Sequence, residues 1–131
     1  VRLLPALEAE VAKLIRYARQ PEMGDAYVET VFALNRMLTQ ATRNSRLRTI
    51  LESLALQTLR YSRLGLSTPQ RRRQSVQHWQ KLVKAIRDGD AAAAEHTAQQ
   101  RVLASRDAAI RQLEEGGADA APRVNASRRI A

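Results

Sequence analysis

The sequence predicts an all-α fold, arranged as an antiparallel helical bundle. Apolar residues recur at three- and four-residue spacing through five segments of the 131 residues, which places them on one face of a helix. None of these segments has the apolar–polar alternation of a half-buried strand. The breaks between consecutive segments are short, and short connections favour antiparallel neighbours in a bundle.

The first two predicted helices are separated by a proline and a glycine. The first stops before Pro21, because proline disfavours helix in the residue before it. The second is expected to begin with Asp25 as N-cap, after Gly24, and to fade at Arg43 and Asn44. The apolar stripe of the first consists of Leu4, Leu7, Val11, Leu14 and Ala18, and one face of the second carries Val28, Val31, Phe32, Asn35 and Leu38.

The third predicted helix has Ser45 as a candidate N-cap and ends at Gly65. Leu56 and Leu59 lie off its main apolar stripe, so we expect this helix to be buried on two sides. The stripe itself consists of Leu47, Ile50, Leu51, Leu54 and Tyr61.

Capping residues mark the last two helices. Thr68 is the expected N-cap of the fourth, with Pro69 in its first turn, and this helix stops at Asp88 and Gly89. Asp90 is expected to cap a long fifth helix that ends at Gly116 and Gly117. The apolar positions are Val76, Trp79, Leu82, Val83 and Ile86 on the fourth helix, and Ala94, Ala98, Val102, Ala109, Ile110 and Leu113 on the fifth.

The sequence divides into a helical domain and a tail. Residues 1–115 are expected to form one helical domain, in a sequence that starts at Val1 rather than Met. Residues 116–131 are mostly Ala, Gly and Arg with little to bury, which predicts a flexible tail.

Composition limits the functional class. The absence of cysteine excludes disulfides and thiolate metal sites, and neither a signal peptide nor an apolar run of membrane-spanning length is present. We therefore expect a cytoplasmic protein with no membrane partner. The net charge of +9 makes nucleic-acid binding an alternative, but the basic residues are scattered. The run Arg71, Arg72 and Arg73 is interpreted as a solvated basic turn, with a contact to DNA phosphates or an acidic partner as the alternative.

No catalytic motif is present. The sequence has no Gly-rich phosphate loop, no HExxH and no nucleophile elbow. Glu114 and Glu115 are adjacent and so lie on different helix faces, while His78 and His96 are expected to be surface or boundary residues. We expect no enzymatic activity and no cofactor.

Two sequence blocks resemble the C-terminal sensing domain of GntR-family regulators, the FCD type. Residues 34–38 and 41–47, continued by 50–54, resemble the pattern Phe-His-x-x-Leu…Ala-Ser-Gly-Asn-Pro-Arg-Leu. Residues 82–94 are similar to Ile-Leu-x-Ala-Ile-x-x-Gly-Asp-x-x-Ala-Ala. The blocks stand in the family's order, and the resemblance covers roughly residues 4–113.

The resemblance implies a bundle of six or seven helices that forms a homodimer. Its internal pocket would sense a small organic acid, a carboxylate effector, and would alter DNA binding by a winged helix-turn-helix. Neither that module nor the family's first sensing-domain helix is recognisable here, so DNA would be read only through a missing N-terminal domain. The resemblance thus implies that residues 1–115 are an effector-binding and dimerisation domain, truncated at its N-terminus. Leu56, Leu59 and the stripe of the first helix offer surplus apolar surface for an isologous dimer contact.

The resemblance also implies where a metal would bind. Many members hold a divalent ion with an Asp and a His four residues apart and with two later histidines. These positions fall on Val31, Asn35, Trp79 and Arg101, none of which matches its family ligand. A one-residue shift would bring only His78 into play. We therefore expect no metal at this site.

The same four positions predict a ligand site without a metal. Arg101 is expected to hold a carboxylate through its planar guanidinium, Asn35 to add a hydrogen bond, and Trp79 to form an apolar wall, with Val31 on the same face as Asn35. Alternatively, Trp79 only fills the space of the metal, and Arg101 reaches solvent or pairs with an acid.

A different function is also compatible with this sequence. A helical interaction or scaffold module would have a dry Leu/Ala core where a sensor has a pocket between the second, fourth and fifth helices.

Overall fold

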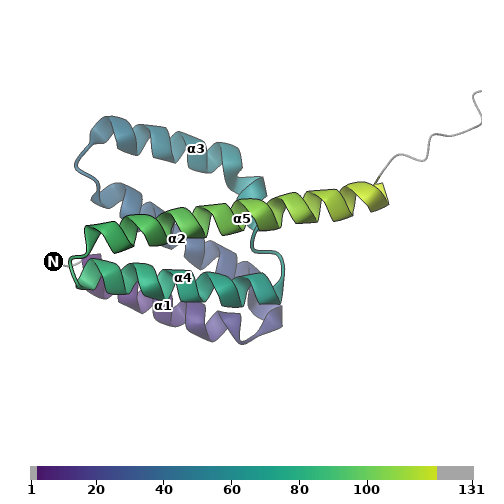
Figure 1. Cartoon of the computed structure of the whole chain (residues 1–131), viewed down its shortest axis with the longest axis horizontal. Helices are drawn as coiled ribbons and strands as arrows, with labels where there is room; N and C mark the ends of the chain where they lie inside the picture. Colours follow the sequence, from purple (N-terminus) through teal and green to yellow (C-terminus); the bar gives the residue numbers. More distant parts are fainter. Residues whose placement is uncertain (1–2, 121–131) are drawn as a thin grey trace, which may run out of the picture.

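The computed structural model describes residues 3–120, and every regular element in this range is helical. The predicted all-α antiparallel bundle is therefore confirmed. Figure 1 shows α1, α2, α4 and α5 side by side, with α3 at the edge of the bundle and α5 projecting beyond it. The elements are α1 (Leu3–Ala18), the 3-10 helix η1 (Pro21–Met23), α2 (Gly24–Ala41), α3 (Ser45–Leu64), α4 (Pro69–Arg87) and α5 (Ala91–Ala120).

Two of the predicted N-caps are confirmed. The Thr68 hydroxyl accepts a hydrogen bond from the backbone N–H of Arg71 at 3.1 Å, and the Asp90 carboxylate accepts one from Ala93 at 2.9 Å. Between α4 and α5, Gly89 has φ +68°, a left-handed conformation that glycine adopts without steric cost. The predicted break at this point is thus fixed by the backbone.

The other two predicted N-caps are wrong. Asn44, not Ser45, caps α3, because its extended backbone lets its side chain accept from the Leu47 N–H at 3.0 Å. Asp25 does not cap α2, since η1 runs directly into this helix and Met23 occupies the N-cap position without a side-chain hydrogen bond. The N-cap position thus lies one residue before the predicted one in α3 and two residues before it in α2.

The core lies between α1, α2 and α4. The α1 stripe is completely used here, which removes it from the surface that we expected to be available to a dimer partner. Trp79 of α4 and Tyr27 of α2 are the largest side chains with no exposed surface. The buried apolar residues from these three helices are Leu7, Val11, Leu14, Ala18, Tyr27, Val28, Val31, Leu34, Val76, Trp79, Leu82, Val83 and Ala85.

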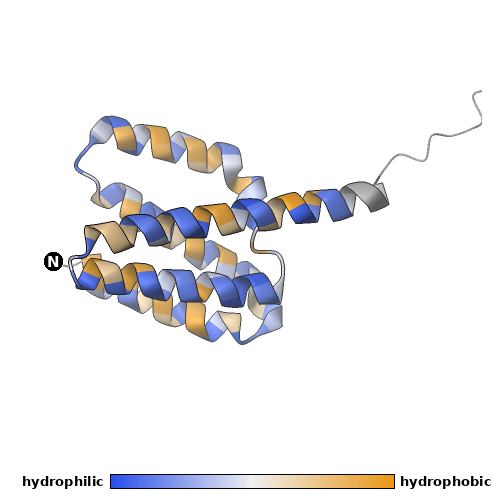
Figure 2. Ribbon diagram, viewed as in Figure 1, coloured by the Kyte–Doolittle hydropathy of each residue, from blue (hydrophilic) through white to orange (hydrophobic). Residues whose placement is uncertain are grey.

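Helix α3 differs most from its prediction. It has no buried residue, so the expectation that it is buried on two sides is wrong for the single chain. Its main contacts are with α2 and α5, and Leu56 is 78% exposed. Figure 2 shows apolar residues along the length of this helix at the edge of the bundle. The apolar pattern therefore has no partner within this part of the chain.

Helix α5 is longer than predicted. It passes through Gly116 and ends at Ala120, because a glycine costs about 1 kcal/mol in a helix interior and does not by itself stop one. Residues 116–120 of the predicted tail are thus helical, and residues 121–131 lie outside the described part of the chain. No helix within residues 3–120 combines the length and apolarity needed to cross a membrane.

Candidate functional site

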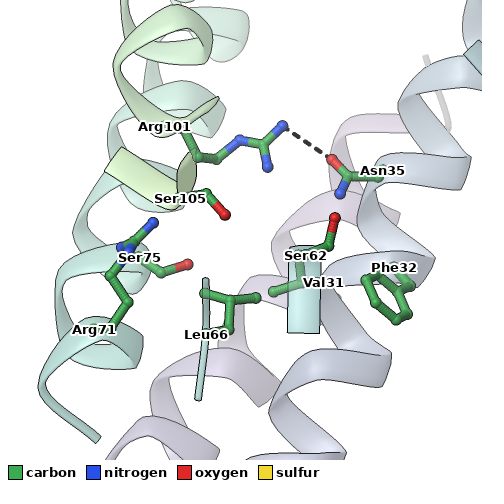
Figure 3. A pocket seen from close by; sticks show the side chains of 9 residues that line it. All are labelled: Val31, Phe32, Asn35, Ser62, Leu66, Arg71, Ser75, Arg101 and Ser105. Carbon is green, nitrogen blue, oxygen red and sulfur yellow. Dashed lines mark hydrogen bonds between the residues drawn. The ribbon is translucent and has the colours of Figure 1, made fainter. Parts of the chain in front are cut away.

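The four predicted site residues come from three helices and lie together. Val31 and Asn35 are one turn apart on α2, Trp79 is on α4 and Arg101 is on α5. The Arg101 guanidinium donates a hydrogen bond to the side-chain oxygen of Asn35 at 3.0 Å (Figure 3). Its central carbon lies 4.3 Å from the centroid of the Trp79 ring. Residues far apart in sequence thus form one cluster around Arg101.

A cavity of about 40 Å³ adjoins this cluster. Figure 3 shows side chains of α4 and α5 on one side of it and side chains of α2 on the other. The end of α3 and the connection that follows it complete the lining. The lining residues are Val31, Phe32, Asn35, Ser62, Leu66, Arg71, Ser75, Arg101 and Ser105.

The end of α3 is held tightly against its neighbours. A Cβ at Gly65 would lie 2.7 Å from the carbonyl oxygen of Ser105, so α3 and α5 approach closely only because this residue is glycine. Arg63 pairs with Glu29 of α2 at 2.7 Å and lies over the ring of Phe32 at 5.3 Å. These contacts bring the α3 terminus to the cavity, although the rest of α3 is exposed.

Trp79 does not wall the cavity, contrary to prediction. Its side chain is fully buried, and the Arg101 guanidinium lies over its ring in a cation–π arrangement. Trp79 therefore supports the cation rather than contacting the open space. Val31, Asn35 and Arg101 do line the cavity.

Arg101 is partly buried and has no acidic partner. Burial, and secondarily the charge of Arg71, lower its pKa to about 10, so it remains a cation at neutral pH. Within residues 3–120, no ion pair includes Arg101 or Arg71. Within the described residues, Arg101 thus does not pair with a neighbouring acid, although part of its side chain reaches solvent.

The basic run at the start of α4 is not a solvated turn. Arg71 and Arg72 are each only 5% exposed, and Arg73 alone is exposed. Arg71 lines the cavity, and burial lowers its pKa. The sequence contained a signal for this, because Arg71, Ser75 and Trp79 are spaced four residues apart and share a helix face.

Arg72 links the connection between α3 and α4 to the 3-10 helix η1. Its guanidinium donates to the carbonyl oxygen of Leu66, after α3, at 3.0 Å and to that of Pro21, in η1, at 3.2 Å. Because Leu66 also lines the cavity, Arg72 positions one of its walls. Buried as they are, neither Arg71 nor Arg72 is available to contact DNA phosphates.

The interior around Arg101 contains several buried polar atoms without a hydrogen-bond partner in the described residues. Most of these atoms can donate a hydrogen bond, so the groups they lack are hydrogen-bond acceptors. Burial raises the pKa of the Tyr27 hydroxyl to about 12, although the neighbouring Ser75 side chain and, to a smaller extent, the nearby arginines lower it. Burial, together with Arg71, Lys81 and Arg101, lowers the pKa of His78. The unpartnered atoms on α2, α4 and α5 are Tyr27 Oη, Arg71 Nε, His78 Nδ1, Trp79 Nε1 and Arg101 Nε.

The residues at the inherited metal positions do not fit a divalent ion. Val31 has no donor atom, and the Arg101 guanidinium places a positive charge where the ion would lie. Nowhere within residues 3–120 do three or more His, Cys, Asp or Glu side chains come together as a metal-binding group. The site offers hydrogen-bond donors and positive charge, which suit an anion.

The comparisons with known proteins agree with the fold. The family model described as "FCD domain" matches residues 2–104, which is most of the chain. Searches of curated proteins and of solved structures each returned no match. FCD domains are regulatory rather than enzymatic. The chain therefore belongs to the FCD domain family, the ligand-sensing C-terminal domains of GntR-type regulators.

Proposed function

We propose that this domain senses a small carboxylate at the cavity beside Arg101 and dimerises through its exposed helices. Effector binding would alter DNA binding by the winged helix-turn-helix of the regulator to which the domain belongs. Arg101 would hold the carboxylate, Asn35 would orient the guanidinium and bond the acid, and Val31 would contact its apolar part. Trp79 would support Arg101 from behind.

One observation carries the carboxylate proposal: the cavity has arginines in its lining and no acid. A cation that leaves water loses hydration energy, which a paired anion restores. The carboxylate of a ligand can supply that anion and accept the hydrogen bonds that Arg101 Nε and its neighbours do not make. Two parallel N–H···O bonds from one guanidinium suit a carboxylate well.

The same observation favours a sensor over a scaffold module. A scaffold would have a dry Leu/Ala core between α2, α4 and α5. The lining instead includes three serines, one asparagine and two arginines, which is a costly interior unless it serves binding.

In metal-bearing relatives the ion supplies the positive charge that attracts the acid. Here Arg101 would supply this charge permanently, so binding would need no metal. Treatment with a chelator should therefore leave the affinity for an acid unchanged.

The test is calorimetry or thermal shift with a panel of small carboxylates. Arg101→Met should abolish the stabilisation that the parent chain shows, because the substitution removes the charged hydrogen bonds worth about 1.5–3 kcal/mol each. Arg106→Met, an exposed position on the same helix, is the matched control and should respond like the parent. Absence of binding by every acid, or an equal response from Arg101→Met, would contradict the proposal.

The dimer proposal rests on α3 and the projecting part of α5. Both have large exposed apolar side chains: Leu47, Ile50, Leu51, Leu54, Leu56, Leu59 and Tyr61 on α3, and Val102, Leu103, Ile110 and Leu113 on α5. We define these residues as the α3–α5 apolar surface. So large an exposed apolar surface is typical of an interface.

Charge supports a second copy of this chain as the occupant. Helix α3 contains four arginines and one acid, Glu52, whereas α5 contains three arginines and five acids. A two-fold arrangement would place α3 of each copy against α5 of the other, so that apolar stripes meet and the opposite charges are adjacent.

A further inference from the structure

Arg71 is a buried cation of the cavity lining that forms no ion pair within the described residues. It is 5% exposed and lines the cavity from α4, on the same side as Arg101. Its one side-chain hydrogen bond goes to Gln74, at a long 3.3 Å, and its Nε has no partner in the described residues. A single carboxylate held by Arg101 would leave this second cation unpaired.

The two arginines affect one another. Their like charges repel, and the charge of Arg71 contributes, after burial, to the lowered pKa of Arg101. No carboxylate from the described residues lines the cavity. The lining therefore includes two cations, and the described residues provide neither with an anion.

The remaining polar groups surround both arginines. Ser75 is one turn from Arg71 on α4, and Ser105 is one turn from Arg101 on α5. Ser62 contributes a third hydroxyl from α3. Each guanidinium thus has a hydroxyl of its own helix beside the same space, so hydrogen-bonding groups are available at both ends of a ligand.

We propose that the effector is a small dianion, a short dicarboxylate, with one carboxylate held by Arg101 and the other by Arg71. This inference rests on the proposed function and adds the second anchor and the charge of the ligand. Two carboxylates neutralise both buried cations, whereas a monocarboxylate neutralises one. Selectivity would then follow from ligand charge, because the unpaired cation penalises every monoanion.

The cavity limits the length of the acid. Its volume of about 40 Å³ corresponds to about three water-sized positions, fewer than the non-hydrogen atoms of even the shortest diacids. Oxalate or malonate would therefore have to displace lining side chains, and longer diacids would have to displace more of them and should bind more weakly.

The experiment compares acetate with malonate by isothermal titration calorimetry at pH 7.5. The parent chain should bind malonate at least about 10-fold more tightly than acetate. Arg71→Met should lower malonate affinity about 10- to 100-fold and leave acetate affinity within about threefold. An apolar residue of similar length is often neutral for stability when it replaces a buried cation, and Arg71→Gln provides a second, polar variant. Arg73→Met, the exposed neighbour, should behave like the parent.

Each contrary outcome has a distinct meaning. Equal affinity of the parent for acetate and malonate, or a malonate preference that survives in both Arg71 variants, would overturn the second anchor and leave the carboxylate sensor standing. Binding of sulfate without any dicarboxylate would overturn the ligand class. If no carboxylate binds, both proposals fail.

Discussion

At the scale of single residues, Arg72 connects α4 to the segment after α3 and to η1 through two hydrogen bonds. Arg72→Met would leave the carbonyl oxygens of Leu66 and Pro21 without their charged donor. We expect a loss of about 3–6 kcal/mol in the free energy of unfolding, from two hydrogen bonds to a charged group. Urea denaturation followed by circular dichroism measures this loss.

Arg73→Met is the matched control for this prediction. Arg73 is the exposed neighbour in the same helical turn, and its substitution should change stability by no more than about 0.5 kcal/mol. Equal stability of the two variants would show that the Arg72 hydrogen bonds contribute little.

Part of the candidate site was predictable from sequence. Alignment of the family pattern located Val31, Asn35 and Arg101, because helix periodicity fixes which positions face the interior. The roles of Arg71 and Arg72 were missed, since a run of three arginines resembles a solvated turn. Burial depends on which residues cover the turn. Arg72 is covered by Leu66, which is nearby in sequence, and by Pro21, which is 51 residues away and whose position the sequence pattern does not reveal.

At the scale of helices, the positions of the breaks were predictable because they depend on local chemistry. Thr68 and Asp90 cap their helices through their own side chains, and Gly89 adopts a left-handed turn. The burial of α3 was not predictable in this way. Its apolar pattern indicates that something covers the helix, but periodicity cannot say whether that is the same chain or another.

The α3–α5 apolar surface gives a prediction about assembly. The parent chain of 14.7 kDa should be a dimer at micromolar concentration, and Leu54→Glu should shift it to the monomer by placing a charge in the apolar contact. Light scattering coupled to gel filtration measures the mass. Leu54 is 48% exposed in the single chain, so its substitution should leave the monomer folded.

The control for assembly is Gln80→Glu, which adds the same charge to an exposed position of α4 away from this surface. It should remain dimeric. A parent chain that is monomeric at micromolar concentration, or a Leu54→Glu variant that stays dimeric, would contradict the proposed interface.

At the scale of the whole molecule, positive charge is both abundant and partly buried. The chain has a net charge of +9, and two of its positive charges, Arg71 and Arg101, lie in the interior between α2, α4 and α5, near His78. Any further proton taken up there increases repulsion. Stability should therefore depend on pH through His78, even though this histidine is not a predicted site residue.

The lowered pKa of His78 determines the direction of that dependence. In the unfolded chain its pKa is near the ordinary 6.5, so at mildly acidic pH the unfolded state binds more protons than the folded state. The free energy of unfolding should be constant above about pH 7.5 and should decrease as the pH falls through 6.5 toward the lower folded pKa.

His78→Gln should remove this part of the decrease, whereas His96→Gln, at an exposed position of α5, should retain it. Saturating malonate should also reduce it, because a dianion beside Arg71 and Arg101 offsets two of the charges that lower the pKa of His78. Urea denaturation between about pH 5 and 8, at about half-unit steps, covers the range in which histidine titrates. It gives one stability curve each for the parent, His78→Gln, His96→Gln and the parent with malonate. Parallel curves for the parent and His78→Gln would show that burial and the neighbouring cations do not lower the pKa of His78.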